Sequence, residues 1–384
     1  MNRQVIIAAK PRFEVLDGLR GVAAMMVVAF HLFETYSGGD HTRQIINHGY
    51  LAVDFFFALS GFVIGYAYDD RWAKGMGLWT FFKRRLIRLH PLLILGTSFG
   101  ALMFYFQGDM PDWSRIGTTP WWMLALICLY GFTLIPIPKS FDIRGWGEMH
   151  PLNNAQWSLM WEYIANVLYA LVIRRFPKWL LAAFVALSAI LTAILCFDVD
   201  VFGVLAARSD AAYTVIGGWS LEPHHLQIAV TRLLYPFFAG LLISRLKWSV
   251  PVRRGGFAAT AFIIAIVLAM PYFAPASMPW VNGLYETFAI LIVFPFVVMM
   301  GAGSNEGGRL CRFLGEISYP LYVTHYPLVY VQMSWMAAHP NLPAATHAAV
   351  GVSLFILAIA IAYASLKLYD IPVRKWLANK EVTK

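Results

Sequence analysis

The sequence predicts an all-α polytopic membrane protein, a helix bundle with about ten transmembrane helices. Of the 384 residues, 59% are hydrophobic and only 13% are charged, whereas soluble domains carry about 25% charged residues. The mean hydropathy is +0.60. Apolar stretches of membrane-spanning length recur along the whole chain, and short basic segments separate them. We therefore expect one integral-membrane domain over 1–384.

The net charge of +9 does not indicate nucleic-acid binding, because the basic residues cluster between apolar stretches, as the positive-inside rule expects. Cys128, Cys196 and Cys311 are scattered, so they predict neither a disulfide framework nor a metal site. We expect no metal. The N-terminus lacks a convincing cleavage site and is interpreted as leading into a retained first span.

Eleven apolar stretches are candidate spans, near 15–35, 50–68, 91–107, 120–136, 156–173, 179–197, 226–244, 256–273, 283–301, 317–337 and 346–368. Eleven crossings would put several basic loops on the wrong side of the membrane. If 120–136 does not cross the membrane, every later basic loop lies on the cytoplasmic side. That stretch begins with Pro120 and two tryptophans and ends in prolines, so we predict that it is re-entrant or interfacial. The N-terminal segment 1–13 and the tail 370–384 are then both cytoplasmic.

The first span carries ionisable residues that a membrane helix normally excludes. Asp17 and Arg20 lie near its start and His31 near its end. Eleven residues turn a helix by about 1100°, close to three full turns, so Arg20 and His31 share one face about 16 Å apart. Ionisable groups inside a bilayer are functional candidates by default.

The second span opens with Asp54, which enters the membrane from the outer side and should reach the depth of His31. A carboxylate beside an imidazole fixes its tautomer and raises its basicity. Gly61 lies on the same face as Asp54, and Gly61 with Gly65 predicts close approach of a neighbouring helix.

Basic residues gather before the third span, in FFKRRLIRLHP. Arg84, Arg85 and Arg88 lie within about one turn at the inner membrane edge. Arginine forks bind phosphate groups, and they also anchor a helix to anionic lipid.

The fifth span carries a polar stripe formed by Ser158, Glu162, Asn166 and Tyr169. Such a stripe must face protein or a wet cavity. By the predicted topology, Glu162 should also reach the depth of His31. Trp157 suits a membrane-interface belt.

Two later spans carry further polar residues. Tyr322 and His325 share a face of 317–337, and His325 is either a second functional group or a core histidine. Arg232 and Glu286 lie in or near the seventh and ninth spans and are candidates to pair.

Taken together and in order, these motifs resemble the acyltransferase-3 family of multi-pass membrane acyltransferases, from about residue 13 to 377. The opening motif is similar to LDGLRGVAAMMVVAFH, with Arg20 followed by His31. The later motifs correspond to GYLAVDFFFALSGFVI, FKRRLIRLHP, WSLMWE, LGEISYPLYVTHYP and YDIPVRKWL.

The resemblance implies transfer of an acyl group, most often acetyl, from cytoplasmic acyl-CoA to a hydroxyl of a saccharide or lipid-linked glycan in the bacterial inner membrane. His31 would be the general base or would carry a transient acyl group, oriented by Asp54 or Glu162. Arg20, Arg84, Arg85 and Arg88 would bind the donor. The remaining site residues, assigned to substrate binding, are Asp17, Trp157, Ser158, Tyr322 and His325.

Two alternatives remain open at this point. The same intramembrane His, Asp and Glu side chains suit a proton-coupled transporter. Some family members carry a C-terminal extracytoplasmic esterase-like domain, whereas this sequence ends in a short basic tail. The chain therefore either acts alone or uses a separate extracytoplasmic partner, and it contacts membrane lipid in both cases.

Overall fold

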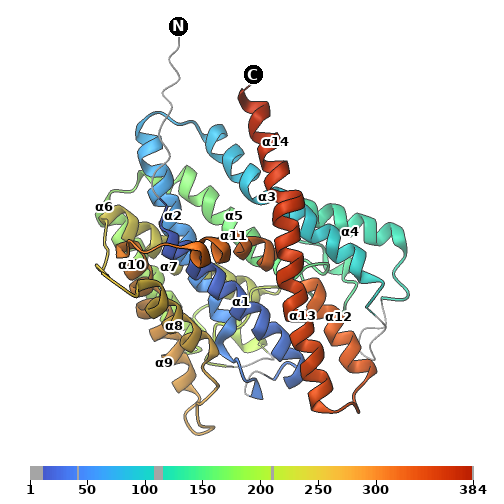
Figure 1. Ribbon diagram of the computed structural model, residues 1–384. Helices are drawn as coiled ribbons and strands as arrows, with labels where there is room; N and C mark the ends of the chain where they lie inside the picture. The colour runs from blue at the N-terminus through green and yellow to red at the C-terminus, as the bar shows by residue number, and fades with distance from the viewer. Residues whose placement is uncertain (1–11, 41–42, 108–115, 209–211, 383–384) are drawn as a thin grey trace.

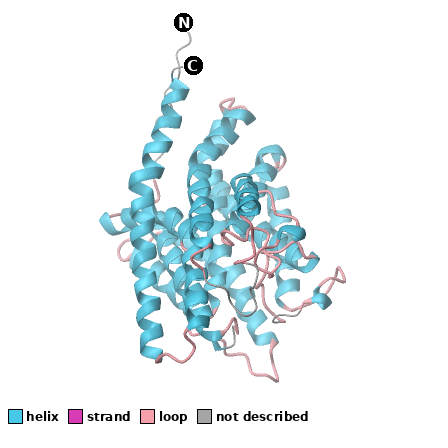
Figure 2. Cartoon of the chain, turned by 90° about the vertical axis from the view of Figure 1, so that its right-hand side faces the viewer, coloured by secondary structure: helices cyan, strands magenta, loops and turns pink. Residues whose placement is uncertain are grey.

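The computed structural model describes residues 12–40, 43–107, 116–208 and 212–382, and Figure 2 shows helices joined by loops, without a β-strand in these ranges. Seven helices among these residues are long and apolar enough to cross a membrane. The predicted all-α, polytopic membrane fold is therefore confirmed. Most of the predicted N-terminal segment 1–13 lies outside the described residues.

The long helices overlap the predicted spans. They are α1 (Glu14–Ser37), α2 (Ala52–Ala73), α3 (Leu78–Phe104), α6 (Lys178–Cys196), α7 (Pro223–Leu246), α9–α10 (Trp280–Phe288 and Phe294–Gly303, joined by a π-helical turn) and α13–α14 (Ala344–Ala364 and Ile371–Val382, joined likewise). However, α3 begins at Leu78, well before the predicted start at 91, so the basic segment FFKRRLIRLHP lies within this helix and not before it. The other predicted spans are shorter or interrupted: α5 (Gln156–Leu171), α8 (Gly256–Ala269), and α11 (Arg309–Thr324) followed by α12 (Tyr326–Ala338).

The stretch 120–136 forms α4 (Trp121–Thr133), a helix of 13 residues. At 1.5 Å per residue it is about 20 Å long, shorter than the roughly 30 Å hydrocarbon core. Its first turn exposes Trp121 and Trp122. This length agrees with the prediction that the stretch does not cross the membrane.

The two ends of the molecule hold different elements. We call the end that holds the start of α1 and all of α14 the upper end, and the opposite one the lower end, as in Figure 1. α1 descends from the upper end to the lower end. The loop before α11 meets the start of α1, where the backbone N–H of Gly308 donates to Glu14 Oε2 over 3.0 Å. The tail 370–384 is helical as far as Val382 and extends α13 upward.

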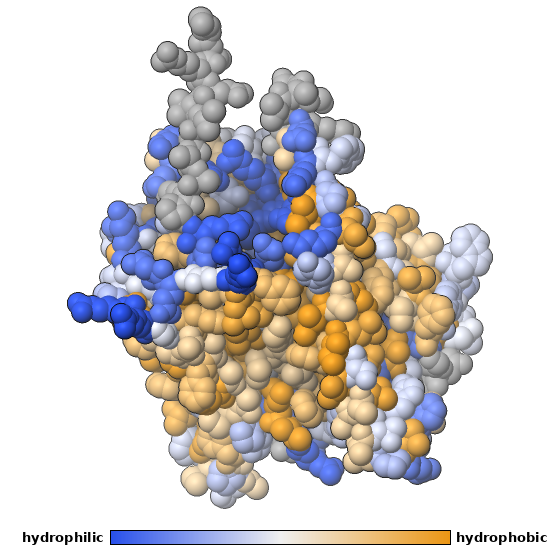
Figure 3. Space-filling model, in the orientation of Figure 1, coloured by the Kyte–Doolittle hydropathy of each residue, from blue (hydrophilic) through white to orange (hydrophobic). Residues whose placement is uncertain are grey.

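A broad hydrophobic belt crosses the face of the molecule seen in Figure 3, below the hydrophilic upper end. Large apolar side chains are exposed on the outer helices, including Leu187 (57%), Phe262 (66%) and Ile356 (61%). A soluble monomer does not expose a continuous apolar surface of this extent. The belt is therefore the surface that faces lipid.

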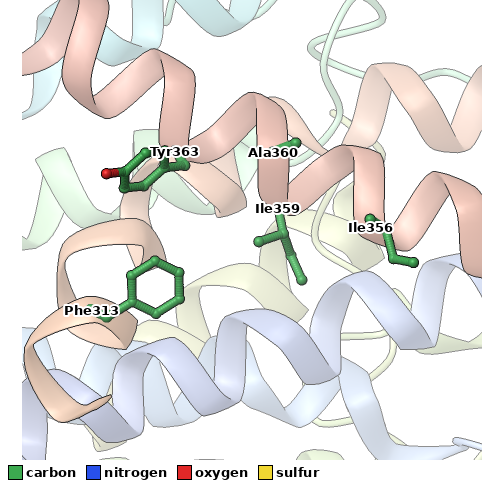
Figure 4. Close-up of a pocket in the computed structure, with 5 residues that line it drawn as sticks. All are labelled: Phe313, Ile356, Ile359, Ala360 and Tyr363. Carbon is green, nitrogen blue, oxygen red and sulfur yellow. The ribbon is translucent and has the colours of Figure 1, made fainter. Parts of the chain in front are cut away.

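An open apolar groove of about 460 Å³ lies on this belt between α11 and α13 (Figure 4). Phe313 and Tyr363 face each other across it, with ring centroids 6.2 Å apart. Its other lining residues are Ile356, Ile359 and Ala360. Because this lining offers no carboxylate, imidazole, thiol or amine, the groove is not a candidate catalytic site.

Helices α2 and α7 pack at the closest approach allowed by their glycines. A methyl group built on Gly61 would overlap the carbonyl oxygen of Phe237, and one built on Gly240 would overlap that of Ala58. Gly65 faces the same helix, against Leu241. The predicted role of Gly61 and Gly65 in helix packing is thus confirmed.

Replacing Gly61 by alanine is expected to destabilise the bundle by about 1–3 kcal/mol, because the added methyl group forces two backbones apart. The thermal stability of the detergent-solubilised protein, followed by size-exclusion chromatography, measures this. Gly77→Ala is the matched control, since nothing lies within 4 Å of a methyl group at Gly77. Equal stability of the two variants would contradict the close packing.

Candidate active site

His31 lies at the lower end of α1, and its carboxylate partner is Glu34 from the next turn. The ring nitrogen Nδ1 lies 2.9 Å from Glu34 Oε2. Since a carboxylate only accepts hydrogen bonds, Nδ1 carries the hydrogen and Nε2 of the neutral ring carries the lone pair. The side chains of His31 and Glu34 are 21% and 32% exposed. This pair can accept a proton from a bound hydroxyl.

A break in the late span positions His325 beside His31. Pro327 has no backbone N–H, so the carbonyl of Val323 loses its helical partner. The side-chain amide of Asn153 donates to that carbonyl instead, over 2.6 Å. His325 lies at the break, and its Nδ1 donates to the carbonyl oxygen of Tyr322 over 2.8 Å. The predicted continuous span 317–337 is therefore divided into α11 and α12.

The two imidazole rings stack, with centroids 5.5 Å apart and an interplanar angle of 27°. The ring of Tyr326 meets the His31 ring edge-on at 4.8 Å. The amide of Asn154 donates to the Tyr326 hydroxyl over 3.2 Å. These four side chains form one cluster, which we call the histidine cluster.

Two of the predicted substrate-binding residues hydrogen-bond to each other one turn above His325. The hydroxyl oxygens of Ser158 and Tyr322 are 2.6 Å apart. Trp157 does not face lipid, because it is buried against Gly218 and lies under the guanidinium of Arg232, 5.4 Å from ring centroid to Cζ. The prediction of an interface-belt role for Trp157 is wrong.

The four predicted arginines gather higher in the bundle. Arg20 is within 3.4 Å of Asp17, which is three residues earlier on α1. Arg88 is exposed and lies within electrostatic range of Arg20, Arg85 and Asp17. Arg84 is exposed on the same helix as Arg88. The arginines therefore concentrate positive charge between α1 and α3, above the histidine cluster.

Glu162 belongs to this upper group and does not contact His31. Its Oε1 accepts from Arg85 over 2.8 Å and from the hydroxyl of Ser60 over 3.2 Å. The preceding segment 148–155 is buried, so α5 begins inside the bundle and not at its surface. The expected convergence of Glu162 on His31 is not seen, because its partners are Arg85 on α3 and Ser60 on α2.

Asp54 does not contact His31 either, because it pairs with Arg232. The two side chains are 0% and 2% exposed, and Arg232 Nη2 lies 2.7 Å from Asp54 Oδ2. Arg232 also donates to the backbone carbonyls of Tyr50 and Gly217. Glu286, which we expected beside Arg232, instead accepts from the Tyr50 hydroxyl over 2.5 Å.

Glu148 extends the polar network on the lower side of the histidine cluster. Its Oε2 accepts from the Tyr330 hydroxyl over 2.7 Å, and Arg144 lies 3.9 Å away. Burial in this loop raises the pKa of Glu148 to about 8, although Arg144 opposes the shift.

A comparison with protein families matches residues 13–366 to the acyltransferase domain of one family. The chain belongs to the acyltransferase-3 family. The predicted enzyme class, an acyltransferase for groups other than aminoacyl groups, is thereby confirmed at the level of this family. Because the match covers nearly the whole described chain, it includes α1 with the histidine cluster, and the arginines of α3.

Three relatives illustrate the range of this acyltransferase family. Protein 2 in the picA locus of Rhizobium radiobacter is 36% identical over 166 residues, 41% of this chain and 81% of that protein. The peptidoglycan O-acetyltransferase OatA of Listeria monocytogenes is 25% identical over 82% of this chain, which spans only 49% of its length. The acyltransferase MdmB of Streptomyces mycarofaciens is 24% identical over 83% of this chain and 79% of its own. No solved structure matches the chain.

Sequence reasoning missed two members of the candidate site. Glu34 lies three residues after His31, a spacing that places both on one helix face. Asn154 lies in a loop, and no periodicity marks its contact with Tyr326 across the bundle. The first could have been found from helical spacing, whereas the second depends on tertiary structure.

Proposed function

We propose that this protein is a membrane O-acyltransferase that transfers an acyl group from acyl-CoA to a hydroxyl of a saccharide or glycoconjugate. One observation carries the proposal: His31, held by Glu34, lies at the lower end of the same helix whose upper half carries Arg20. The helix thus joins a group of cations to a proton acceptor.

The upper arginines fit the phosphates of acyl-CoA. Arg88 is exposed, and Arg20 and Arg85 add positive charge within electrostatic range of it. Guanidinium groups bind phosphates through paired hydrogen bonds. Arg20, Arg84, Arg85 and Arg88 would hold the nucleotide end, and bound acyl-CoA would supply an activated acyl group as its thioester.

The chain supplies the proton chemistry at the lower end. His31 Nε2 accepts the proton of the acceptor hydroxyl as its oxygen attacks the acyl carbon, and the thiol leaves with a proton returned from His31. Glu34 stabilises the imidazolium between these steps. An acyl group carried transiently by His31 requires the same lone pair, and this alternative remains open.

The proposed topology puts the upper end in the cytoplasm of a bacterial inner membrane, with both termini inside. The basic segments between apolar stretches support this orientation, as the positive-inside rule expects. The donor would then bind from the cytoplasm and the saccharide or lipid-linked glycan from the outer side. The acceptor is delivered either directly to this protein or by a separate extracytoplasmic partner.

The test is release of free thiol by the purified protein with acetyl-CoA and a panel of saccharides, followed by mass spectrometry of the saccharide. We expect acceptor-dependent release of CoA and an added acetyl mass. Proton-coupled uptake of solute into liposomes, with no CoA released for any acceptor, would instead support a transporter.

Replacing Glu34 by glutamine is expected to lower kcat about 10- to 100-fold, because an amide no longer holds the Nδ1–H tautomer or stabilises the imidazolium. The rate of CoA release at saturating acceptor measures this. Glu316→Gln is a control at an exposed carboxylate paired with Lys367. Equal rates for Glu34→Gln and the unmodified protein would contradict the assigned pair.

A further inference from the structure

His325 has a buried nitrogen that the protein itself does not satisfy. The residue is 1% exposed, and its Nε2 is enclosed with no hydrogen-bond partner. Buried polar atoms are nearly always hydrogen-bonded in native proteins. The Nε2 atom therefore points to a partner supplied by a ligand.

The chemistry of that ligand follows from the tautomer. Nδ1 of His325 donates to the carbonyl of Tyr322, which can only accept, so Nε2 of the neutral ring is an acceptor. Asn154, whose amide nitrogen donates to Tyr326, also has a buried and unpartnered Oδ1. Two acceptor atoms around Tyr326 suit a ligand that presents hydrogen-bond donors, such as hydroxyl groups.

These acceptors adjoin the proposed base. The rings of His31 and His325 are stacked at 5.5 Å, and each Nδ1 is already engaged, by Glu34 and by Tyr322. Both Nε2 atoms are consequently acceptors. A hydroxyl hydrogen bond spans about 2.8 Å, so two hydroxyls on neighbouring carbons match in scale two rings stacked at this distance.

On the basis of the proposed acyl transfer, we propose that the acceptor is a polyol whose reactive hydroxyl has a free hydroxyl on the neighbouring carbon. His31 takes the proton of the reactive hydroxyl, while His325 Nε2 accepts a hydrogen bond from its neighbour. His325 is then a specificity-determining residue. A saccharide with an isolated hydroxyl leaves Nε2 unsatisfied and is a poor acceptor.

The test measures binding directly, so that it does not depend on turnover. Methyl glucoside, galactoside and rhamnoside, each with its monodeoxy analogues at the ring hydroxyls, are titrated into purified protein by isothermal calorimetry. His325→Asn keeps an amide N–H for the Tyr322 carbonyl and removes the distal acceptor. His325→Gln places an amide oxygen near the Nε2 position, and His339→Asn is the control at an exposed histidine.

We expect at least one parent glycoside to bind about 10-fold or more tightly than its deoxy analogue, because the missing hydroxyl leaves a buried acceptor unpaired. His325→Asn should weaken the parent about 10-fold and leave the deoxy analogue unchanged. His325→Gln should restore part of this discrimination, and His339→Asn should bind like the unmodified protein.

Three results would overturn the inference: no parent glycoside binds at high millimolar concentration, parent and deoxy sugars bind alike, or His325→Asn weakens both equally. A His325→Asn effect on the KM for acetyl-CoA alone would assign Nε2 to the donor's pantetheine arm and also overturn it. Discriminating binding without any CoA release would leave the polyol-binding role of His325 standing and reject the proposed acyl transfer.

Discussion

Replacing His31 by alanine is expected to lower kcat/KM for acyl transfer by about 10²–10⁴-fold, the usual contribution of a positioned general base. The variant loses the only lone pair that Glu34 orients, and the acceptor hydroxyl must then lose its proton to water. Because His31 is partly exposed at the end of α1, the change should leave the bundle folded. Acceptor-dependent CoA release at matched protein concentration measures the loss.

The matched control is His339→Ala, which removes an exposed imidazole at the end of α12. Size-exclusion profiles and thermal stability of both variants should equal those of the unmodified protein. His31→Ala with full activity would reject both the general base and the acyl-histidine alternative, since both need this ring. A loss of activity accompanied by aggregation is resolved by His31→Gln, which retains a polar side chain of similar size.

The sequence predicted the helices well because hydrophobic stretches of about 20 residues have few alternatives in a membrane. Charge counting singled out 120–136, which forms the short helix α4 of 13 residues; α8, with 14 residues, is nearly as short, so the non-crossing role of 120–136 stays a prediction. The division of 317–337 into α11 and α12 was harder to predict from the sequence. It depends on Asn153, which reaches the carbonyl of Val323 from another segment.

The partners of the two acids were predicted wrongly for different reasons. Asp54 shares the face of Gly61, and that face packs against α7, so Asp54 meets Arg232 rather than α1. Helical periodicity indicates this face, whereas depth in the membrane does not distinguish α7 from α1. Glu162 depends on where α5 begins inside the bundle, which only the buried loop before it determines.

Replacing Arg232 by methionine is expected to destabilise the fold by about 3–5 kcal/mol, the usual cost of leaving one member of a buried ion pair without its partner. Asp54 would stay completely buried, and the carbonyls of Tyr50 and Gly217 would lose their donors. The free energy of unfolding from an SDS titration in mixed micelles measures the change. Lys367→Met is the control, because Lys367 and Glu316 pair in the open at 41% and 48% exposure, where an ion pair contributes at most about 1 kcal/mol.

The double variant Asp54→Leu with Arg232→Met separates the cost of a stranded charge from the value of the pair. Removing both charges is expected to recover much of the lost stability, because apolar replacements of a buried pair are often nearly neutral. Recovery should be incomplete by about 1–3 kcal/mol, since the carbonyls that Arg232 satisfied remain buried. A double variant as unstable as Arg232→Met alone would show that the carbonyl contacts, not the Asp54 charge, account for the loss. Full recovery would show that the loop carbonyl of Gly217 finds another donor, and that Arg232 stabilises the fold through Asp54 alone.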